Sequence, residues 1–249
     1  MFATCKLVFV YMALGIPAGV LGIPYSLLAG NTALLYRIVV HGIVRWGVSA
    51  AGITVQVIGR ERVPAGVASI ILPNHVSNLD PPVLFPAIPG MAAAMLKKQL
   101  MRIPLLGTGM RLGGFVPVER SSRREDAKAS VEKAAVSLQR GMHMLIFAEG
   151  TRSKDGRLQT FKRGPFYLAM ETGAPIVPVV ISGTEKMMRK GSMAITPGVA
   201  RVEFLDPVWP KDFATREELM AAVRDRMVEA LPEEMRPISI RCGSSMDGT

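Results

Sequence analysis

Cysteine is scarce in this sequence, and its two cysteines lie far apart along the chain. Cys5 is near the amino terminus and Cys242 near the carboxyl terminus, and there is no CxxC pair or Cys/His cluster. A structural zinc site needs such a cluster of ligands, so no metal site is expected. The two cysteines are interpreted as inert thiols in a reducing compartment.

Aromatic residues are also few, at 6% of 249 residues, whereas 30 Lys and Arg residues against 20 Asp and Glu give a formal net charge of +10. A net positive charge favours binding to anions, such as nucleic acid, an anionic membrane surface or phosphorylated substrates. No basic run is interleaved with aromatic side chains on which bases could stack. Because hydrophobic residues make up 49% and the mean hydropathy is +0.28, the composition favours an anionic membrane surface and no nucleic acid.

Charge is absent from the long stretch between Lys6 and Arg37. This stretch is long enough to span a bilayer as a helix, although its glycines and prolines also suit a bent or re-entrant segment. In the following stretch Arg37, His41 and Arg45 are four residues apart, which places them on one helix face at a membrane interface. No signal-peptide cleavage site is evident, so residues 1–50 are predicted to be a retained helical membrane anchor.

Beyond the anchor, apolar strand-like segments alternate with helical ones. This order predicts an α/β domain with a mostly parallel sheet flanked by helices, over residues 51–240, followed by a disordered tail at 241–249. The clearest helix covers residues 121–141, with a capping box of Ser122 and Glu125 and a stop at Gly141. The predicted strands are 53–59, 67–73, 91–96, 113–118, 143–150, 175–182 and 200–206, and the other predicted helices are 81–88, 164–174 and 216–231.

The segment NHVSNLD, residues 74–80, follows a predicted buried strand and precedes two prolines. His75 and Asp80 can meet only if the chain turns between them, because positions i and i+5 diverge by roughly 140° on a helix. Asn and Ser residues between them supply such a turn. Asp80 could orient His75 as a general base, or it could simply cap the next helix, with His75 a polar loop residue. Since GxSxG is absent and neither cysteine has a catalytic context, the histidine would most simply activate a hydroxyl of the substrate.

A second polar segment, EGTRS, follows the predicted strand at 143–150. Gly150 would allow close backbone approach, Thr151 offers a hydroxyl, and Arg152 offers a planar fork for phosphate. Taken alone, the segment could equally be a surface or capping turn. The basic residues at 97–111 could likewise be a solvated face.

The order of motifs resembles that of the glycerolipid acyltransferases, in particular the 1-acylglycerol-3-phosphate acyltransferases. The chain has NHVSNLD for the family's N-H-x-x-x-x-D motif, a KKxL…IP…G lead-in to GGFVPVER, then EGTRS and IVPVVI. The resemblance covers about residues 50–210 and implies the glycerol-phosphate acyltransferase fold for the α/β domain. The second motif departs slightly, because Glu119 places an acid beside Arg120.

The resemblance implies a role for each matching residue. His75 would deprotonate the free hydroxyl of lysophosphatidate, Asp80 would orient His75, and the hydroxyl oxygen would attack an acyl thioester without an acyl-enzyme. Residues 176–181 would help to form the acyl-donor site. The residues implied to hold the phosphate are Lys97, Arg120 and Arg152, and those implied to shape the acceptor site are Glu149, Gly150 and Thr151.

The resemblance also implies the partners and the location. Lysophosphatidate and acyl-CoA or acyl carrier protein would be the substrates, at an anionic membrane surface with the active site on its cytoplasmic face. No cofactor or metal would be needed. The sequence leaves open the acyl donor, the chain length, another lysophospholipid as acceptor, and a non-catalytic lipid-binding protein or a thioester hydrolase as other classes.

Overall fold

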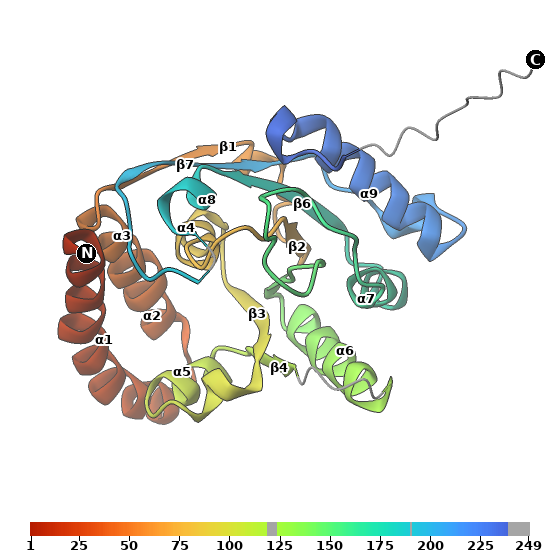
Figure 1. Ribbon diagram of the computed structural model, residues 1–249. Helices are drawn as coiled ribbons and strands as arrows, with labels where there is room; N and C mark the ends of the chain where they lie inside the picture. Colours follow the sequence, from red (N-terminus) through yellow and green to blue (C-terminus); the bar gives the residue numbers. More distant parts are fainter. Residues whose placement is uncertain (119–123, 190, 239–249) are drawn as a thin grey trace, which may run out of the picture.

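One seven-stranded sheet forms the centre of the protein (Figure 1). The computed structural model describes residues 1–118, 124–189 and 191–238. The strand order is β1-β7-β6-β2-β5-β3-β4, and neighbours are parallel except β6 and β7, which are antiparallel. The predicted mostly parallel α/β sheet is therefore confirmed. The strands are β1 (Ile53–Ile58), β2 (Ile70–Pro73), β3 (Ala92–Lys97), β4 (Val116–Val118), β5 (His143–Leu145), β6 (Ile176–Ser182) and β7 (Gly198–Phe204).

The central strands are apolar because both of their faces are covered. In β2 all four residues are buried, and Ile70 and Leu72 face one hydrophobic core whereas Ile71 faces the other. A sheet covered on both faces needs continuous apolar runs rather than alternation. The first core contains side chains from α4 (Asp80–Leu84) and the N-terminal helices, and the second contains side chains from α6 (Arg124–Gln139), α7 (Gly164–Thr172) and α9 (Arg216–Ala230).

The flanking helices mostly lie where the sequence predicts them. The helix α9 begins at a capping box in which Thr215 and Glu218 bond each other's backbone N–H groups. Gly141, with a φ of 79°, follows the end of α6, while the capping box predicted at Ser122 and Glu125 lies outside the described residues and side chains. Two short helices, α5 and α8, were not predicted. The helices of the α/β domain are α4 (Asp80–Leu84), α5 (Leu106–Leu112), α6 (Arg124–Gln139), α7 (Gly164–Thr172), α8 (Thr184–Met187) and α9 (Arg216–Ala230), with short helical turns η2 (Arg60–Arg62), η3 (Phe85–Ala87), η4 (Lys98–Arg102), η5 (Pro210–Asp212) and η6 (Glu233–Met235).

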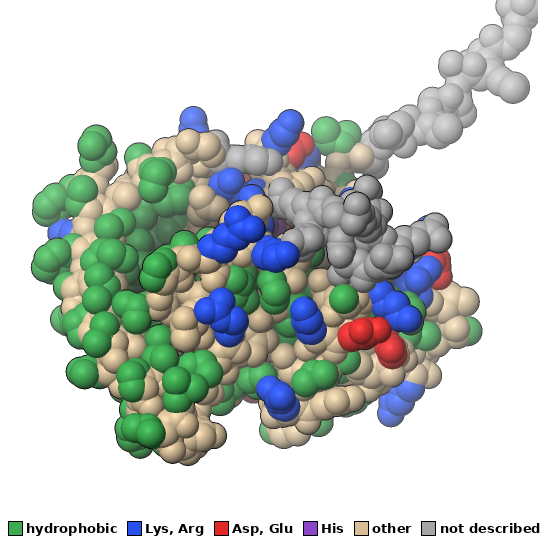
Figure 2. Space-filling view, turned by 90° about the horizontal axis from the view of Figure 1, so that it is seen from below, with side chains coloured by type: hydrophobic (Ala, Val, Ile, Leu, Met, Phe, Trp, Pro, Cys, Tyr) green, Lys and Arg blue, Asp and Glu red, His purple; other side chains and the backbone are tan. Residues whose placement is uncertain are grey.

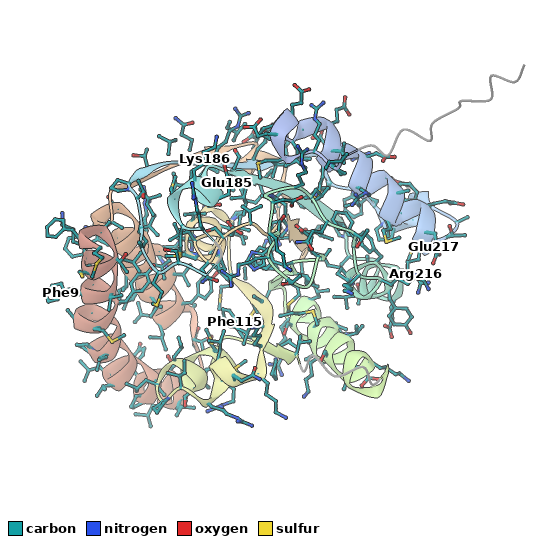
Figure 3. The ribbon with its side chains drawn as sticks, viewed as in Figure 1. Phe9, Phe115, Glu185, Lys186, Arg216 and Glu217 are labelled. Atoms are coloured by element: carbon teal, nitrogen blue, oxygen red, sulfur yellow. The ribbon has the colours of Figure 1, made fainter. Side chains whose placement is uncertain are left out.

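The N-terminal segment is a single long helix, α1 (Phe2–Ala29), which runs along one side of the domain (Figure 1). It continues through Pro17 and Pro24 without a break. By length and composition it could cross a membrane, and only 11% of its most apolar window is buried. Phe9 points away from the rest of the protein (Figure 3). The exposed apolar surface of α1 matches the predicted hydrophobic anchor helix.

A second helical segment returns from α1 to the sheet and consists of α2 (Ala33–Tyr36), η1 (Arg37–Val44) and α3 (Arg45–Ala50). The middle part, η1, is π-helical. Arg37 and Arg45 are exposed, whereas His41 is half-buried with its ring edge against Tyr36. The segment packs closely on α1 at Gly47, where an added Cβ would collide with Tyr11.

Candidate active site

The carboxyl ends of four neighbouring parallel strands meet at one edge of the sheet. His75 follows β2, Glu149 follows β5 and Thr184 follows β6, while Lys97 is the last residue of β3. Because β6, β2, β5 and β3 are parallel neighbours, their carboxyl ends lie at the same edge. Ligands of open α/β sheets bind in this position.

His75 and Asp80 are directly hydrogen-bonded, with 2.8 Å between His75 Nδ1 and Asp80 Oδ2. The strand β2 ends at Pro73, residues 74–79 turn, and Asp80 begins α4. The turn formers in NHVSNLD therefore bring together two side chains that no regular element could. The side chain of Asp80 is fully buried, and that of His75 is 17% exposed, so the imidazole remains accessible from the site.

The Asp80 carboxylate accepts hydrogen bonds with both oxygens. Oδ2 also accepts the backbone N–H groups of Val76 and Ser77, each at 2.8 Å. Because these bonds already use Oδ2 as an acceptor, we assign the proton of the His75 bond to Nδ1, which leaves Nε2 able to take a proton. The helix α4 has no side-chain cap hydrogen bond, so the alternative in which Asp80 caps that helix is wrong.

Thr184 is a part of the site that the sequence did not indicate. Its Oγ1 donates to Asp80 Oδ1 at 2.6 Å, and the residue is fully buried. It comes immediately after β6 and Gly183, 104 residues from Asp80. The one available signal is a hydroxyl directly after a buried strand, at the edge where ligands gather.

Asn74 connects the histidine turn to β6. Its Nδ2 donates to the carbonyl of Ile181 at 2.9 Å, and its Oδ1 accepts the N–H of Ile181 at 2.7 Å. This pair of bonds replaces a strand-to-strand pairing just where β2 ends. The first residue of NHVSNLD therefore fixes the start of the turn rather than facing a substrate, since Asn74 is almost fully buried.

Glu149 holds the backbone of the histidine turn from the other side. Its Oε1 accepts the N–H of His75 at 2.7 Å, and its Oε2 accepts the N–H of Gln159 at 3.2 Å. Burial raises the pKa of Glu149 to about 7, although both N–H bonds lower it; the charge of Asp80 adds to the rise and Arg224 opposes it. The carboxyl group of EGTRS thus joins two loops of the site.

The imidazole of His75 also packs on an aromatic ring. The ring centroids of His75 and Phe147 are 3.9 Å apart, with 27° between the planes. The carbonyl of His75 accepts the N–H of Ser153 at 2.8 Å. The EGTRS segment and the residue two positions before it therefore fix both the ring and the backbone of His75.

The other described residues of the predicted site lie along the same edge. Gly150 and Thr151 are exposed in the turn after β5, and Gly150 has a φ of +71°, which favours glycine. Arg152 is half-buried in that turn, and Lys97 is exposed at the end of β3. Arg120 lies outside the described residues.

The arrangement can remove a proton from a hydroxyl group. A fixed carboxylate holds Nδ1 of the histidine, and Nε2 is left to act as a base, in the manner of the His–Asp pair of a catalytic triad. Among the described residues, the structure places no group of three or more His, Cys, Asp or Glu side chains so that it could hold a metal ion.

Comparison with known proteins gives the class of protein. The acyltransferase family profile matches residues 54–182, just over half of the chain, so the chain belongs to the acyltransferase family. A 1-acyl-sn-glycerol-3-phosphate acyltransferase of Limnanthes douglasii is 28% identical over 221 residues, which cover 88% of this chain and 77% of the relative. The human 1-acyl-sn-glycerol-3-phosphate acyltransferase alpha is 30% identical over 76% of this chain and 66% of the relative.

A solved structure shares the whole architecture. The crystal structure of the 1-acyl-sn-glycerophosphate (LPA) acyltransferase PlsC from Thermotoga maritima has a TM-score of 0.80 to this chain, at 26% identity and with 92% of each chain covered. The fold expected from the motif resemblance is therefore confirmed.

Proposed function

We propose that this acyltransferase moves a fatty acyl group from an acyl thioester to the free sn-2 hydroxyl of lysophosphatidate, which gives phosphatidate and a free thiol. The observation that carries the proposal is the bond of 2.8 Å between His75 Nδ1 and the buried Asp80 carboxylate, at the edge where four strands end. The names of the relatives support the acceptor, since they are 1-acyl-sn-glycerol-3-phosphate acyltransferases.

His75 acts as the general base of this reaction. Its Nε2 accepts the hydroxyl proton while the hydroxyl oxygen attacks the thioester carbonyl, and the imidazolium is stabilised by Asp80. Collapse of the tetrahedral adduct breaks the C–S bond, and the thiolate takes the proton back from Nε2. Neither cysteine is needed, and no acyl-enzyme forms.

Basic side chains hold the phosphate of the acceptor in this proposal. Lys97 and Arg152 lie at the edge where His75 lies, and Arg120 follows β4 in the sequence. Holding the phosphate there brings the sn-2 hydroxyl to His75, which contributes through proximity. Residues 176–181, whose side chains are buried in the two hydrophobic cores, support the acyl-donor side, and no cofactor or metal takes part.

The location follows from the substrates. Lysophosphatidate is a membrane lipid, and α1 is apolar and exposed enough to hold the enzyme at the bilayer. Acyl-CoA and acyl carrier protein are water-soluble cytoplasmic donors, so the active site faces the cytoplasm.

Acyl transfer in detergent or vesicles tests the proposal. Labelled acyl-CoA and, separately, labelled acyl carrier protein are supplied with lysophosphatidate to wild type, His75→Ala and His41→Ala, the last as a matched histidine control on η1. Phosphatidate made by wild type and by His41→Ala, and reduced by about 10²–10⁴-fold in His75→Ala, is the expected result. Equal product from His75→Ala would remove His75 from the mechanism. Acyl transfer only to another lysophospholipid would mean that lysophosphatidate is not the acceptor. Thioester hydrolysis alone would mean that the protein is a hydrolase.

A further inference from the structure

A second apolar surface lies beside α1, on the segment that joins β3 to β4. This η4–α5 segment, residues 98–112, exposes three large apolar side chains at intervals of three residues. Leu100 is 40% exposed, and Ile103 and Leu106 are each 45% exposed. Single exposed apolar residues are ordinary on a protein surface, but three on one short segment next to an apolar helix are a patch.

The backbone of this segment is built to turn these side chains outward. Leu105 has a φ of 61° and a ψ of −59°, and the N–H of Leu106 donates to the carbonyl of Pro104 at 2.7 Å. This is a γ-turn with positive φ, a rare conformation that costs about 1–3 kcal/mol and persists only where its surroundings hold it. It sends Leu105 to one side and leaves its neighbours Ile103 and Leu106 exposed.

Leu105 joins the segment to α1. An ideal Cβ on Gly19 of α1 would lie 3.5 Å from a terminal methyl of Leu105, so Leu105 packs on the helix at its glycine. The segment is also fixed internally, because Arg111 donates to the carbonyl of Met101 at 3.1 Å and an added Cβ on Gly107 would collide with that carbonyl. The η4–α5 segment therefore packs beside α1 (Figure 1).

The charge of this surface has one sign. Residues 1–60 and 81–118 contain no Asp or Glu, whereas Lys98 and Arg102 lie in the η4–α5 segment and are exposed. Figure 2 shows hydrophobic side chains over the side where α1 lies and a group of Lys and Arg side chains next to them. An apolar patch rimmed by cations fits an anionic lipid leaflet, where each nearby Lys or Arg adds attraction.

We propose that Leu100, Ile103 and Leu106 insert into the surface of an anionic lipid leaflet, so that the η4–α5 segment is a membrane contact in addition to α1. The segment starts at the residue after Lys97, and its insertion therefore brings the catalytic edge of the sheet to the lipid surface. The contact itself does not depend on which acceptor the enzyme uses.

Quenching of tryptophan fluorescence by brominated lipids tests this contact in the full chain. The native tryptophans are first replaced in a Trp46→Phe, Trp209→Phe background, and Ile103→Trp or Tyr167→Trp is then added. Tyr167 on α7 is the matched control, because it is exposed to the same 45% as Ile103. The proteins are reconstituted in vesicles of phosphatidylglycerol and phosphatidylcholine, with or without bromine near the head of the acyl chains.

The expected result is a blue shift and a loss of emission by brominated lipid for Ile103→Trp, with neither for Tyr167→Trp. Leu106→Trp provides the same measurement if Ile103→Trp does not fold. Water-like emission without quenching at both 103 and 106 would overturn the proposal and indicate a protein partner or bare solvent. Equal quenching in vesicles of phosphatidylcholine alone would overturn the requirement for anionic lipid.

Discussion

The buried Glu149 predicts a specific dependence of stability on pH. Its pKa is raised from 4.5 to about 7 in the folded protein, so the folded state binds the proton more tightly than the unfolded chain does. This contribution to stability is complete below the unfolded pKa and is lost as the pH rises through the folded pKa. Because a tenfold difference in proton affinity corresponds to about 1.4 kcal/mol, the free energy of unfolding falls by roughly 2–3 kcal/mol from about pH 5 to about pH 8.

Glu149→Gln isolates this effect. Glutamine keeps one oxygen that accepts the N–H of His75, but it places an amide donor opposite the N–H of Gln159. The variant therefore loses the hydrogen bond from Gln159, and the cost of this loss does not change with pH. The stability of wild type relative to the variant should therefore fall by roughly 2–3 kcal/mol across the same pH range. For a chain of this size that is about 5–10 °C in the difference between the two melting temperatures.

Thermal unfolding in detergent measures this difference. Wild type, Glu149→Gln and Glu171→Gln are heated at both pH values, and the last is the control because Glu171 is exposed on α7. Wild type and Glu171→Gln should shift together between the two pH values, while Glu149→Gln shifts less. The reasoning is refuted if Glu149→Gln and wild type lose the same stability as the pH rises, because the carboxyl would then titrate as it does in water.

Two further variants probe the supports of the histidine turn. Thr184→Val removes the donor to Asp80 Oδ1 without much change of volume. We expect kcat to fall about tenfold or more with KM little changed, because a hydrogen bond to a charged group contributes roughly 1.5–3 kcal/mol. Thr184→Ser keeps the hydroxyl and should restore the rate. A serine variant as slow as the valine variant would exclude this hydrogen bond as the cause. Asn74→Ala leaves the N–H and carbonyl of Ile181 unpaired in the core, and we expect a loss of about 2–4 kcal/mol in thermal or denaturant unfolding. A loss below about 1 kcal/mol would mean that water or a shifted backbone satisfies those groups.

The strands were predictable because their signal is local. Residues 176–181 are apolar throughout and are followed by Ser182 and Gly183, which is the pattern that a fully buried strand gives. The direction of a strand, in contrast, gives no pattern in the local sequence. Nothing in residues 198–204 indicates that β7 runs antiparallel to β6 and parallel to β1.

The helix α5 was missed for a physical reason. Gly107 and Gly109 lie within its seven residues, and glycine disfavours a helix interior by about 1 kcal/mol each. Tertiary packing compensates: Gly107 lies too close to the carbonyl of Met101 for any side chain. The residue that destabilises the helix locally is thus the one that the packing requires.

Part of the candidate site could be predicted from local sequence, and part of it could not. His75 and Asp80 could be predicted as a pair because they share one turn. Glu149 was expected to shape the acceptor site, which stays a prediction, and in the structure it accepts the backbone N–H groups of His75 and Gln159. The donor role of Thr184 could not be predicted from the sequence, because only the sheet order brings β6 beside β2 and places the hydroxyl at Asp80. Contacts between the ends of neighbouring strands are properties of the topology, not of any stretch of sequence.

The position of His75 is fixed by contacts within the protein. Asp80 holds its Nδ1, Phe147 packs on its ring, and Glu149 and Ser153 hold its backbone N–H and carbonyl. In the proposed reaction, in which His75 is the base, the rate of proton removal depends on how well the acceptor hydroxyl is brought to Nε2. Lipid contact by the η4–α5 segment would do this by keeping the acyl chain of the acceptor in the leaflet while its phosphate lies at the edge that carries Lys97. In the proposed reaction the lipid contact would position the acceptor and His75 would remove its proton, so loosening the lipid contact should raise KM for the lipid acceptor more than it lowers kcat.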